Sequence, residues 1–446
     1  MYREKIEALK KWKTGDKRKP MIIRGARQVG ETWLAKEFGR TEYQKTAYIS
    51  FDNNTRMRSL YAGDFEVERL IQGFKAETGI DIEPDNTLII LDEIQEVPKA
   101  LTALKYFYEN APQYHVIVAG SLLGMALHEG ISFPVGKVDY IKLGPLTFRE
   151  FLLAQNETQL VELMSKTADW ELLSVFHGKF INYLKTYFYI GGMPEVVANY
   201  SVKKSWNEAR EIQKKILYAY NEDFSKHVTK SLVPRLRQVW QTIPAQLAKE
   251  NKKFIYGLIR EGARAKEYEL TLMWLEDAGL IRRLNRIAVP RLPISAYADP
   301  SAFKIYHLDI GLLAAASNLS EKTLLEKNDV FTEFRGSLTE QFAIQELQSQ
   351  TDADICYWAN DGESRVEVEL IAQIAGRIVP IEIKSGINLR ARSLKIYIEK
   401  YRPPIAIRSS PADYKKTNNL YDVPLHLLSS FVTTIVFGDN NESQGV

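Results

Sequence analysis

Cysteine is almost absent from this sequence of 446 residues, since Cys356 is the only one. An internal disulfide is therefore excluded, and the composition favours a reducing compartment such as the cytoplasm. No apolar run is long enough to span a bilayer, so we expect no membrane contact. The N-terminal residues 2–13 are charged and have no apolar centre, which argues against a signal peptide.

Several kinds of site also lack their usual residues. The six histidines are scattered without the spacing of a zinc site, and no Ser–His–Asp order stands out. The formal net charge is only +3, so the chain as a whole is not a polyanion binder. With 45% hydrophobic and 26% charged residues, the composition is typical of a soluble globular protein. The length predicts about two to four domains.

Near its start the sequence contains a glycine-bounded loop between an apolar run and a helical pattern. The loop consists of Gly25, Ala26, Arg27, Gln28, Val29, Gly30, Glu31 and Thr32. Strand, glycine loop and helix form the setting of a phosphate-binding loop, whose backbone N–H groups and helix N-terminus bind phosphate oxygens. In that setting Thr32 reaches Mg²⁺. The alternative is an ordinary strand–turn–helix without a ligand, because this spacing also arises by accident.

The lysine that follows the second glycine of such loops is missing, and Glu31 stands in its place. A lysine attracts the charge of the β- and γ-phosphates, whereas a carboxylate repels it. Between unit charges ~4 Å apart, the interaction is about 1 kcal/mol in water and about 4 kcal/mol at an effective dielectric constant of 20. We therefore predict weakened nucleotide binding and poor hydrolysis.

A second apolar stretch ends in two acids. Residues 88–91 are all apolar, and Asp92 and Glu93 follow them. This pattern is typical of a buried parallel strand that delivers carboxylates to its C-terminal edge. In phosphate-loop ATPases the first acid holds Mg²⁺ and the second orients or deprotonates the attacking water. We predict these roles for Asp92 and Glu93, with ATP as the nucleotide.

Residues 25–30, 91–95 and 119–121 together carry a family resemblance. They resemble the AAA-type ATPase core of a widespread prokaryotic family whose C-terminal region is similar to restriction endonucleases. The resemblance implies ATP binding, Mg²⁺-dependent hydrolysis and a polar sensor at Ser121 that contacts the γ-phosphate or water. A Gly-Ser turn after a strand is also commonplace. The loop lysine is usual in the family, so Glu31 is a departure from it.

The pattern of expected elements divides the chain into successive parts. Residues 1–19 predict an N-terminal helix. Residues 20–145 alternate helices with strands near 21–24, 47–51, 87–91, 115–119 and 138–143, which predicts an ATPase core with a parallel sheet covered on both faces. Residues 146–225 resemble the family's helical lid, with Gly191-Gly192 as a hinge or as a plain connection. Residues 226–291 resemble a winged helix, 292–330 a connector, and 331–446 an endonuclease-like domain. The predicted fold class is α/β: a P-loop NTPase sheet, lid and winged helix, then an α/β restriction-endonuclease-like domain.

The predicted winged helix is basic, with 14 Lys and Arg against six Asp and Glu in residues 226–291. Arg260, Arg264 and Lys266 lie where a recognition helix begins, and Arg282 and Arg283 lie on the wing. Such an excess favours contact with the phosphate backbone of DNA. The alternative is a winged helix used for protein contacts or domain packing, with its charge solvated.

Acids and a lysine near the C-terminus have the spacing of a restriction-endonuclease-like metal site. Glu369 lies 13 residues before Glu382, Lys384 follows on the same expected strand, and Glu340 lies on an earlier helix. In such a site the carboxylates hold Mg²⁺ and the lysine positions or activates water. The resemblance implies an aspartate where Glu369 stands, and Mg²⁺ tolerates the added methylene poorly. We expect a nuclease-like fold more than cleavage.

Three interpretations of function stay open. The leading one is an ATP-binding AAA-like ATPase, impaired by Glu31 and coupled to DNA or to a protein partner. The second is an Mg²⁺-dependent DNA nuclease regulated by nucleotide, and the third is a non-catalytic DNA-binding scaffold. Assembly into a homo-oligomer is compatible with each of them.

Overall fold

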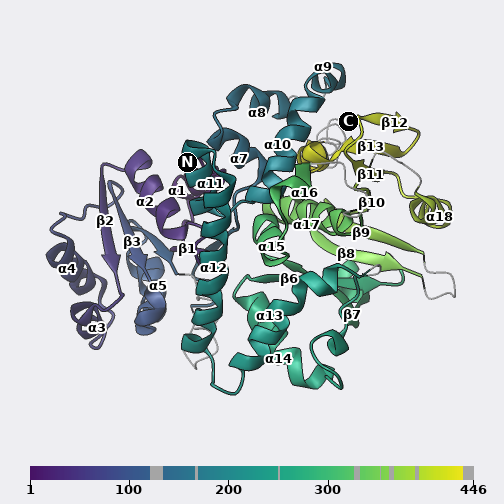
Figure 1. Cartoon of the computed structure of the whole chain (residues 1–446). Coiled ribbons are helices and arrows are strands. Elements are labelled where there is room, and N and C mark those ends of the chain that lie inside the picture. Colours follow the sequence, from purple (N-terminus) through teal and green to yellow (C-terminus); the bar gives the residue numbers. More distant parts are fainter. Residues whose placement is uncertain are drawn as a thin grey trace. The chain divides into compact units, whose positions relative to one another are not determined.

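The computed structural model describes residues 1–120, 134–165, 169–249, 252–325, 332–351, 353–360, 366–386 and 391–434 (Figure 1). The chain forms two compact units. The first, here called the N-terminal unit, comprises residues 2–144 together with 277–280. The second, the C-terminal unit, comprises residue 1, residues 145–276 and residues 281–446.

The N-terminal unit contains a parallel sheet of five strands in the order β2-β3-β4-β1-β5. Its strands are β1 (Met21–Gly25), β2 (Lys45–Ser50), β3 (Thr87–Asp92), β4 (His115–Ala119) and β5 (Asp139–Leu143). The alternating pattern of the sequence predicted these strands to within about two residues, and the structure confirms them.

Helices precede and separate these strands. They are α1 (Lys5–Lys13), α2 (Glu31–Glu42), α3 (Thr55–Leu60), α4 (Val67–Thr78) and α5 (Lys99–Asn110), with a short helix η1 (Ile94–Glu96) after β3. Every residue of β3 and β4 is buried. Ile89 and Leu91 of β3 share one core with Phe74 and Phe107 from the helices. A strand that is covered on both faces has to be apolar along its whole length, so these strands could be predicted from their continuous apolar runs in the sequence.

The C-terminal unit begins with helices and ends in a mixed sheet. The helices are α7 (Phe148–Ala154), α8 (Thr158–Ser165), α9 (Trp170–Val175), α10 (His177–Ile190), α11 (Pro194–Lys203), α12 (Trp206–His227), α13 (Val233–Leu247), α14 (Ala265–Asp277), α15 (Ile310–Ala316), α16 (Glu321–Leu325), α17 (Thr332–Gln350) and α18 (Arg392–Tyr401). Short helices are η2 (Tyr256–Leu258), η3 (Ile294–Tyr297) and η5 (Leu425–Leu427). No described helix is long and apolar enough to cross a membrane.

The sheet of this unit has eight strands in the order β12-β13-β11-β10-β9-β8-β6-β7. They are β6 (Ile281–Ile287), β7 (Ala298–His307), β8 (Asp354–Ala359), β9 (Glu367–Ile374), β10 (Arg377–Ile383), β11 (Ala406–Ser410), β12 (Lys415–Thr417) and β13 (Leu420–Pro424). β6 pairs with β7 antiparallel and with β8 parallel. The strand of the predicted wing, β6, therefore belongs to the same sheet as the C-terminal strands.

Gly191 and Gly192 lie in a tightly packed connection between α10 and α11. A Cβ on Gly192 would lie 2.1 Å from the carbonyl oxygen of Leu146, and one on Gly191 would lie 2.2 Å from Oδ1 of Asp309. The buried carboxylate of Asp309 accepts hydrogen bonds from the N–H of Gly192 at 2.7 Å and of Leu312 at 3.0 Å. Gln345 Nε2 donates to it at 3.3 Å. Because neighbouring atoms leave no room for a Cβ, close packing of the backbone explains the two glycines better than a hinge does.

Candidate functional site

The glycine loop joins the end of β1 to the start of α2. Gln28 and Gly30 have positive φ values of 66° and 97°, so the backbone turns sharply before the helix begins at Glu31. No side chain caps this end of α2. The N-terminus of a helix carries a partial positive charge, and its first backbone N–H groups have no acceptor within the helix. Both features favour the binding of an anion such as phosphate.

Two predicted metal-binding side chains meet beside the loop. The hydroxyl of Thr32 donates to the carboxylate of Asp92, at 3.1 Å from Oδ1 and 3.0 Å from Oδ2. Tyr48 donates its hydroxyl to Oδ2 of the same carboxylate at 2.8 Å. Asp92 is only 4% exposed and is the last residue of β3. A hydroxyl and a carboxylate oxygen form a donor set that fits Mg²⁺.

The predicted catalytic residues follow the ends of β3 and β4. Glu93 has a left-handed backbone with φ of 53°, and its carboxylate accepts a hydrogen bond from Gln95 Nε2. Ser121, the predicted sensor, lies outside the described residues. Of the predicted catalytic pair, the structure therefore places Glu93 alone, next to Asp92.

Glu31 is buried beneath the loop, and is only 7% exposed. Its Oε1 lies close to Gly25. Burial raises the pKa of Glu31 well above its ordinary value; Glu93 and Asp92 raise it further, while a hydrogen bond with the backbone of Gly25 lowers it. Burial therefore opposes the charged form of Glu31, on which the repulsion expected from the sequence depends.

The C-terminal unit brings together a second set of predicted residues. Lys384 Nζ lies 2.6 Å from Oε1 of Glu382 and 3.6 Å from Oε1 of Glu369. The N–H of Ile383 donates to Oε2 of Glu369 at 3.3 Å. The neighbouring strands β9 and β10 thus place these three side chains on the same side of the sheet, as their alternation suggested.

Glu340 is held by groups that the sequence gave no reason to select. Lys252 Nζ forms an ion pair with its Oε1, and the hydroxyl of Tyr306 donates to its Oε2 at 2.8 Å. Although burial acts to raise it, Lys252 and Lys304 hold the pKa of Glu340 below its ordinary value. Lys304 itself is buried on β7 and pairs with Glu367 of β9. Lys304 and Tyr306 are two residues apart on β7 and therefore lie on the same face of the strand, which is the feature of the sequence that could have indicated their shared role.

The carboxyl groups of Glu369 and Glu382 share the single ammonium group of Lys384. Burial, and then the nearby carboxylate of Glu382, raise the pKa of Glu369 to about 8. Oε2 of Glu382 is buried and has no hydrogen-bond partner. Within the described ranges, no group of three or more His, Cys, Asp or Glu side chains is arranged to hold a metal ion. As folded, the predicted Glu340, Glu369 and Glu382 set therefore does not fit Mg²⁺.

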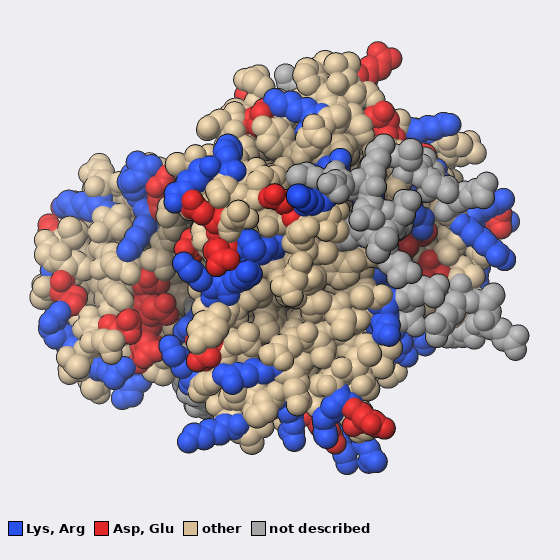
Figure 2. All heavy atoms as spheres, in the orientation of Figure 1, with Lys and Arg blue, Asp and Glu red and all other residues tan. Residues whose placement is uncertain are grey.

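The predicted DNA-contacting residues differ in what they touch. Arg264 and Lys266 are exposed at the start of α14. Arg260 pairs with Glu267 at 2.6 Å. Arg282 Nη1 donates to backbone carbonyls, at 2.8 Å for Leu308. The side chain of Arg283 is 12% exposed and pairs with two glutamates, Glu269 and Glu276. This engagement argues against DNA contact by Arg282 and Arg283. On the face drawn in Figure 2, basic and acidic side chains are interspersed.

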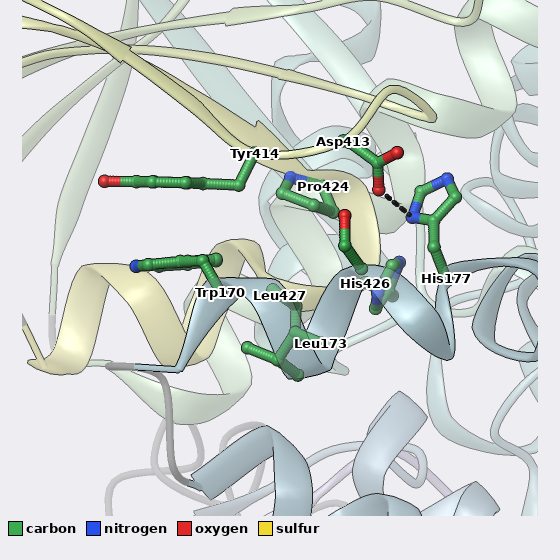
Figure 3. Close-up of a pocket in the computed structure, with 9 residues that line it drawn as sticks. Trp170, Leu173, His177, Asp413, Tyr414, Pro424, His426 and Leu427 are labelled. Carbon is green, nitrogen blue, oxygen red and sulfur yellow. Dashed lines mark ion pairs between the residues drawn. The ribbon is translucent and has the colours of Figure 1, made fainter.

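A small pocket lies where α9 and α10 meet the chain around β12 and β13 (Figure 3). Trp170 stacks on Tyr414 with ring centroids 3.7 Å apart, and His177 Nδ1 lies 3.3 Å from Asp413 Oδ1. Burial lowers the pKa of His426 well below its ordinary value. The space is about 10 Å³, room for about one water molecule. We interpret it as a packing contact within the unit.

Comparison with known protein families assigns three segments. Residues 17–152 match a family described as an AAA domain. Residues 181–323 match a domain of unknown function, DUF8612, and residues 335–428 match another, DUF4143. No curated protein has a sequence that matches this chain.

Solved structures resemble the chain only distantly. The Walker-type ATPase PABY2304 of Pyrococcus abyssi is 14% identical, with a TM-score of 0.43, and covers 70% of this chain and 95% of its own. The Aeropyrum pernix Orc1 protein in complex with DNA is 15% identical, with a TM-score of 0.28, over 70% and 90%. The Thermotoga maritima RuvB Holliday junction branch migration motor is 12% identical, with a TM-score of 0.27, over 64% and 90%. Such scores carry no argument about function. The family match and the five-stranded parallel sheet together identify an AAA-type ATPase domain in the N-terminal unit.

Proposed function

We propose that this chain binds ATP with Mg²⁺ through residues 25–32 and Asp92, and that it hydrolyses ATP slowly. The observation that carries this proposal is the hydrogen bonding of the Thr32 hydroxyl to the Asp92 carboxylate, at 3.0 and 3.1 Å, beside an uncapped helix N-terminus. These are the groups that a phosphate-bound Mg²⁺ needs from the protein.

Each residue of the site has a separate task in this proposal. The backbone N–H groups of the loop and the start of α2 bind phosphate oxygens. Thr32 and Asp92 would hold Mg²⁺, which when bound neutralises phosphate charge. Glu93 would orient the attacking water and accept its proton, after Gln95 releases its carboxylate. Glu31 supplies no positive charge to the leaving phosphate, so hydrolysis suffers more than binding.

Calorimetric titration with ATP, with and without Mg²⁺, tests the proposal. We expect Mg²⁺ to tighten ATP binding to the natural chain, and Asp92→Asn to remove most of that effect. Tyr48→Phe serves as a matched control, since it removes a hydrogen bond to the same carboxylate but no metal ligand. Equal Mg²⁺ dependence in the natural chain and Asp92→Asn would contradict the assignment.

A second candidate function is Mg²⁺-dependent nucleic-acid cleavage by the C-terminal unit. It rests on the close approach of Glu369, Glu382 and Lys384 on adjacent strands, and the absence of a metal-holding group among the described acids speaks against it. Plasmid nicking that is lost in both Glu382→Ala and Lys384→Ala would support it. A chain that binds DNA without turning over ATP or DNA would instead support the scaffold interpretation, with Arg264 and Lys266 as the exposed contacts.

A further inference from the structure

A buried arginine near the start of the chain contacts the glycine loop. Arg3 is only 3% exposed. Its Nη1 donates to the carbonyl of Val29 in the loop at 2.8 Å, and its Nη2 donates to the carbonyl of Gly144, directly after β5, at 2.6 Å. All three residues belong to the N-terminal unit. Burying a charged group is costly unless it is hydrogen-bonded, and here two backbone carbonyls stabilise the guanidinium group.

Helix α1 fixes the position from which Arg3 reaches the loop. Ile6, Leu9 and Trp12 are three residues apart along α1, and all three are buried. The ring of Trp12 packs against Phe38 of α2, with ring centroids 6.3 Å apart. The carbonyl of Arg3 accepts a hydrogen bond from the N–H of Ile6 at 3.0 Å, which joins Arg3 to the first turn of the helix. The guanidinium group therefore acts from a backbone that is packed into the unit.

The contact with Val29 fixes the direction of the next N–H group in the loop. The peptide between Val29 and Gly30 is trans. In a planar trans peptide the carbonyl and the N–H point in opposite directions, so the N–H of Gly30 points away from Arg3. Gly30 directly precedes the first residue of α2. Its N–H therefore has no acceptor within the helix and is one of the donors that suit a phosphate oxygen.

This direction matters because glycine allows the peptide to turn over. Glycine adopts positive and negative φ values at similar cost, and Gly30 has a φ of 97°. If the peptide turned over, the carbonyl oxygen of Val29 would face the phosphate and repel it. Because Glu31 stands where a lysine is usual, the loop depends on its backbone N–H groups to attract phosphate. Arg3 opposes the turn, since its guanidinium group would lose the carbonyl of Val29.

We propose that Arg3 is a positioning residue that holds the glycine loop in its anion-binding form, so that the N-terminal segment of residues 2–13 sets the affinity of the site for phosphate. The effect acts on phosphate oxygens and not on the base, the ribose or Mg²⁺. Arg3 therefore favours ATP and inorganic pyrophosphate by the same factor. This inference rests on the proposed nucleotide site, but not on its metal or on hydrolysis.

The amide signal of Gly30 reports directly on the proposed contact. Glycine follows valine at two positions of the sequence, Gly30 and Gly136. Labelling the full-length protein with carbonyl-¹³C valine and ¹⁵N glycine thus selects two amides by NMR, and Val135→Ile assigns them by removing the signal of Gly136. We expect pyrophosphate to shift the Gly30 proton signal downfield in the natural chain and much less in Arg3→Met. The Gly136 signal is the internal reference and should not respond.

Calorimetric titration without Mg²⁺ measures the affinity. We expect Arg3→Met to bind ATP and pyrophosphate at least about tenfold more weakly than the natural chain, by the same factor for both. Trp12→Phe is the matched control, because it removes a hydrogen bond from α1 to the carbonyl of Lys19 at 2.7 Å and leaves the loop contact intact. It should bind within about threefold of the natural chain.

The outcomes separate this inference from the proposed function. If the natural chain binds neither ligand and its Gly30 signal does not respond, the nucleotide site is refuted, and the role of Arg3 with it. If the natural chain binds and Arg3→Met binds equally well with the same Gly30 shift, Arg3 alone is refuted. An equal loss in Trp12→Phe would also overturn the inference, since general loss of packing would then explain the effect. Arg3→Lys, which keeps the charge but not the paired donors, replaces Arg3→Met if circular dichroism shows that the latter is unfolded, and the same outcomes apply.

Discussion

Replacing Glu31 by lysine is expected to restore tight nucleotide binding to the glycine loop. In the natural chain this side chain is buried under the loop, and burial raises its pKa. The position that a lysine usually occupies therefore supplies no positive charge. Glu31→Lys supplies the missing charge at the first residue of α2, where phosphate oxygens would lie nearby.

The size of this effect follows from the attraction between one lysine and one phosphate charge. At ~4 Å and an effective dielectric constant of 20 the attraction is about 4 kcal/mol, and water and salt reduce it. A lysine at the positive end of a helix also costs about 0.3–1 kcal/mol. We expect a net gain of about 1.4–2.7 kcal/mol, which is a roughly 10- to 100-fold tighter complex. Hydrolysis is expected to rise by more, because charge grows on the leaving phosphate.

Fluorescent-nucleotide titration and phosphate release measure the two effects. Glu31→Gln is the neutral control, because it removes the ionisable carboxyl group without adding a positive charge, and it should gain less affinity for ATP than Glu31→Lys. Glu68→Lys makes the same substitution at an exposed position of α4, and should change ATP binding little. The reasoning fails if Glu31→Lys binds no more tightly than Glu31→Gln, or if Glu68→Lys gives the same gain.

Three further predictions concern other parts of the chain. Asp309→Asn should destabilise the C-terminal unit by about 2–4 kcal/mol in urea unfolding, because the carboxylate accepts from three donors and an amide cannot replace both oxygens; an unchanged midpoint would contradict this. Burial lowers the pKa of His115 from 6.5 to about 4, so the unfolded chain takes up a proton first. Stability from this group is therefore complete above about pH 6.5 and falls toward pH 4, by about 2–3 kcal/mol, and the slope should flatten in His115→Gln. If DNA binds at α14, Arg264→Gln and Lys266→Gln should each reduce the salt slope of binding by about one, whereas the engaged Arg283→Gln should not; equal slopes in all three variants would exclude this surface.

The sequence determined the N-terminal sheet and the meeting of Thr32 with Asp92. Strands buried on both faces have to be apolar along their whole length, so their runs are visible without a structure. Parallel strands also end at a common edge, which brings the loop after β1 and the acid at the end of β3 together although β4 lies between them. The alternation of β9 and β10 likewise predicted that Glu369, Glu382 and Lys384 approach one another.

Only the tertiary structure decided which charges are available. Lys252 and Glu340 form an ion pair although 88 residues separate them, and the type of either residue says nothing about this choice. Burial under the loop raises the pKa of Glu31, and Arg283 is engaged because two glutamates of α14 face it. A sequence states the charge that a side chain can carry. The solvation of that side chain and its charged or hydrogen-bonding partner depend on packing between distant segments. These two factors set the pKa of the group and the charge it carries in the folded protein.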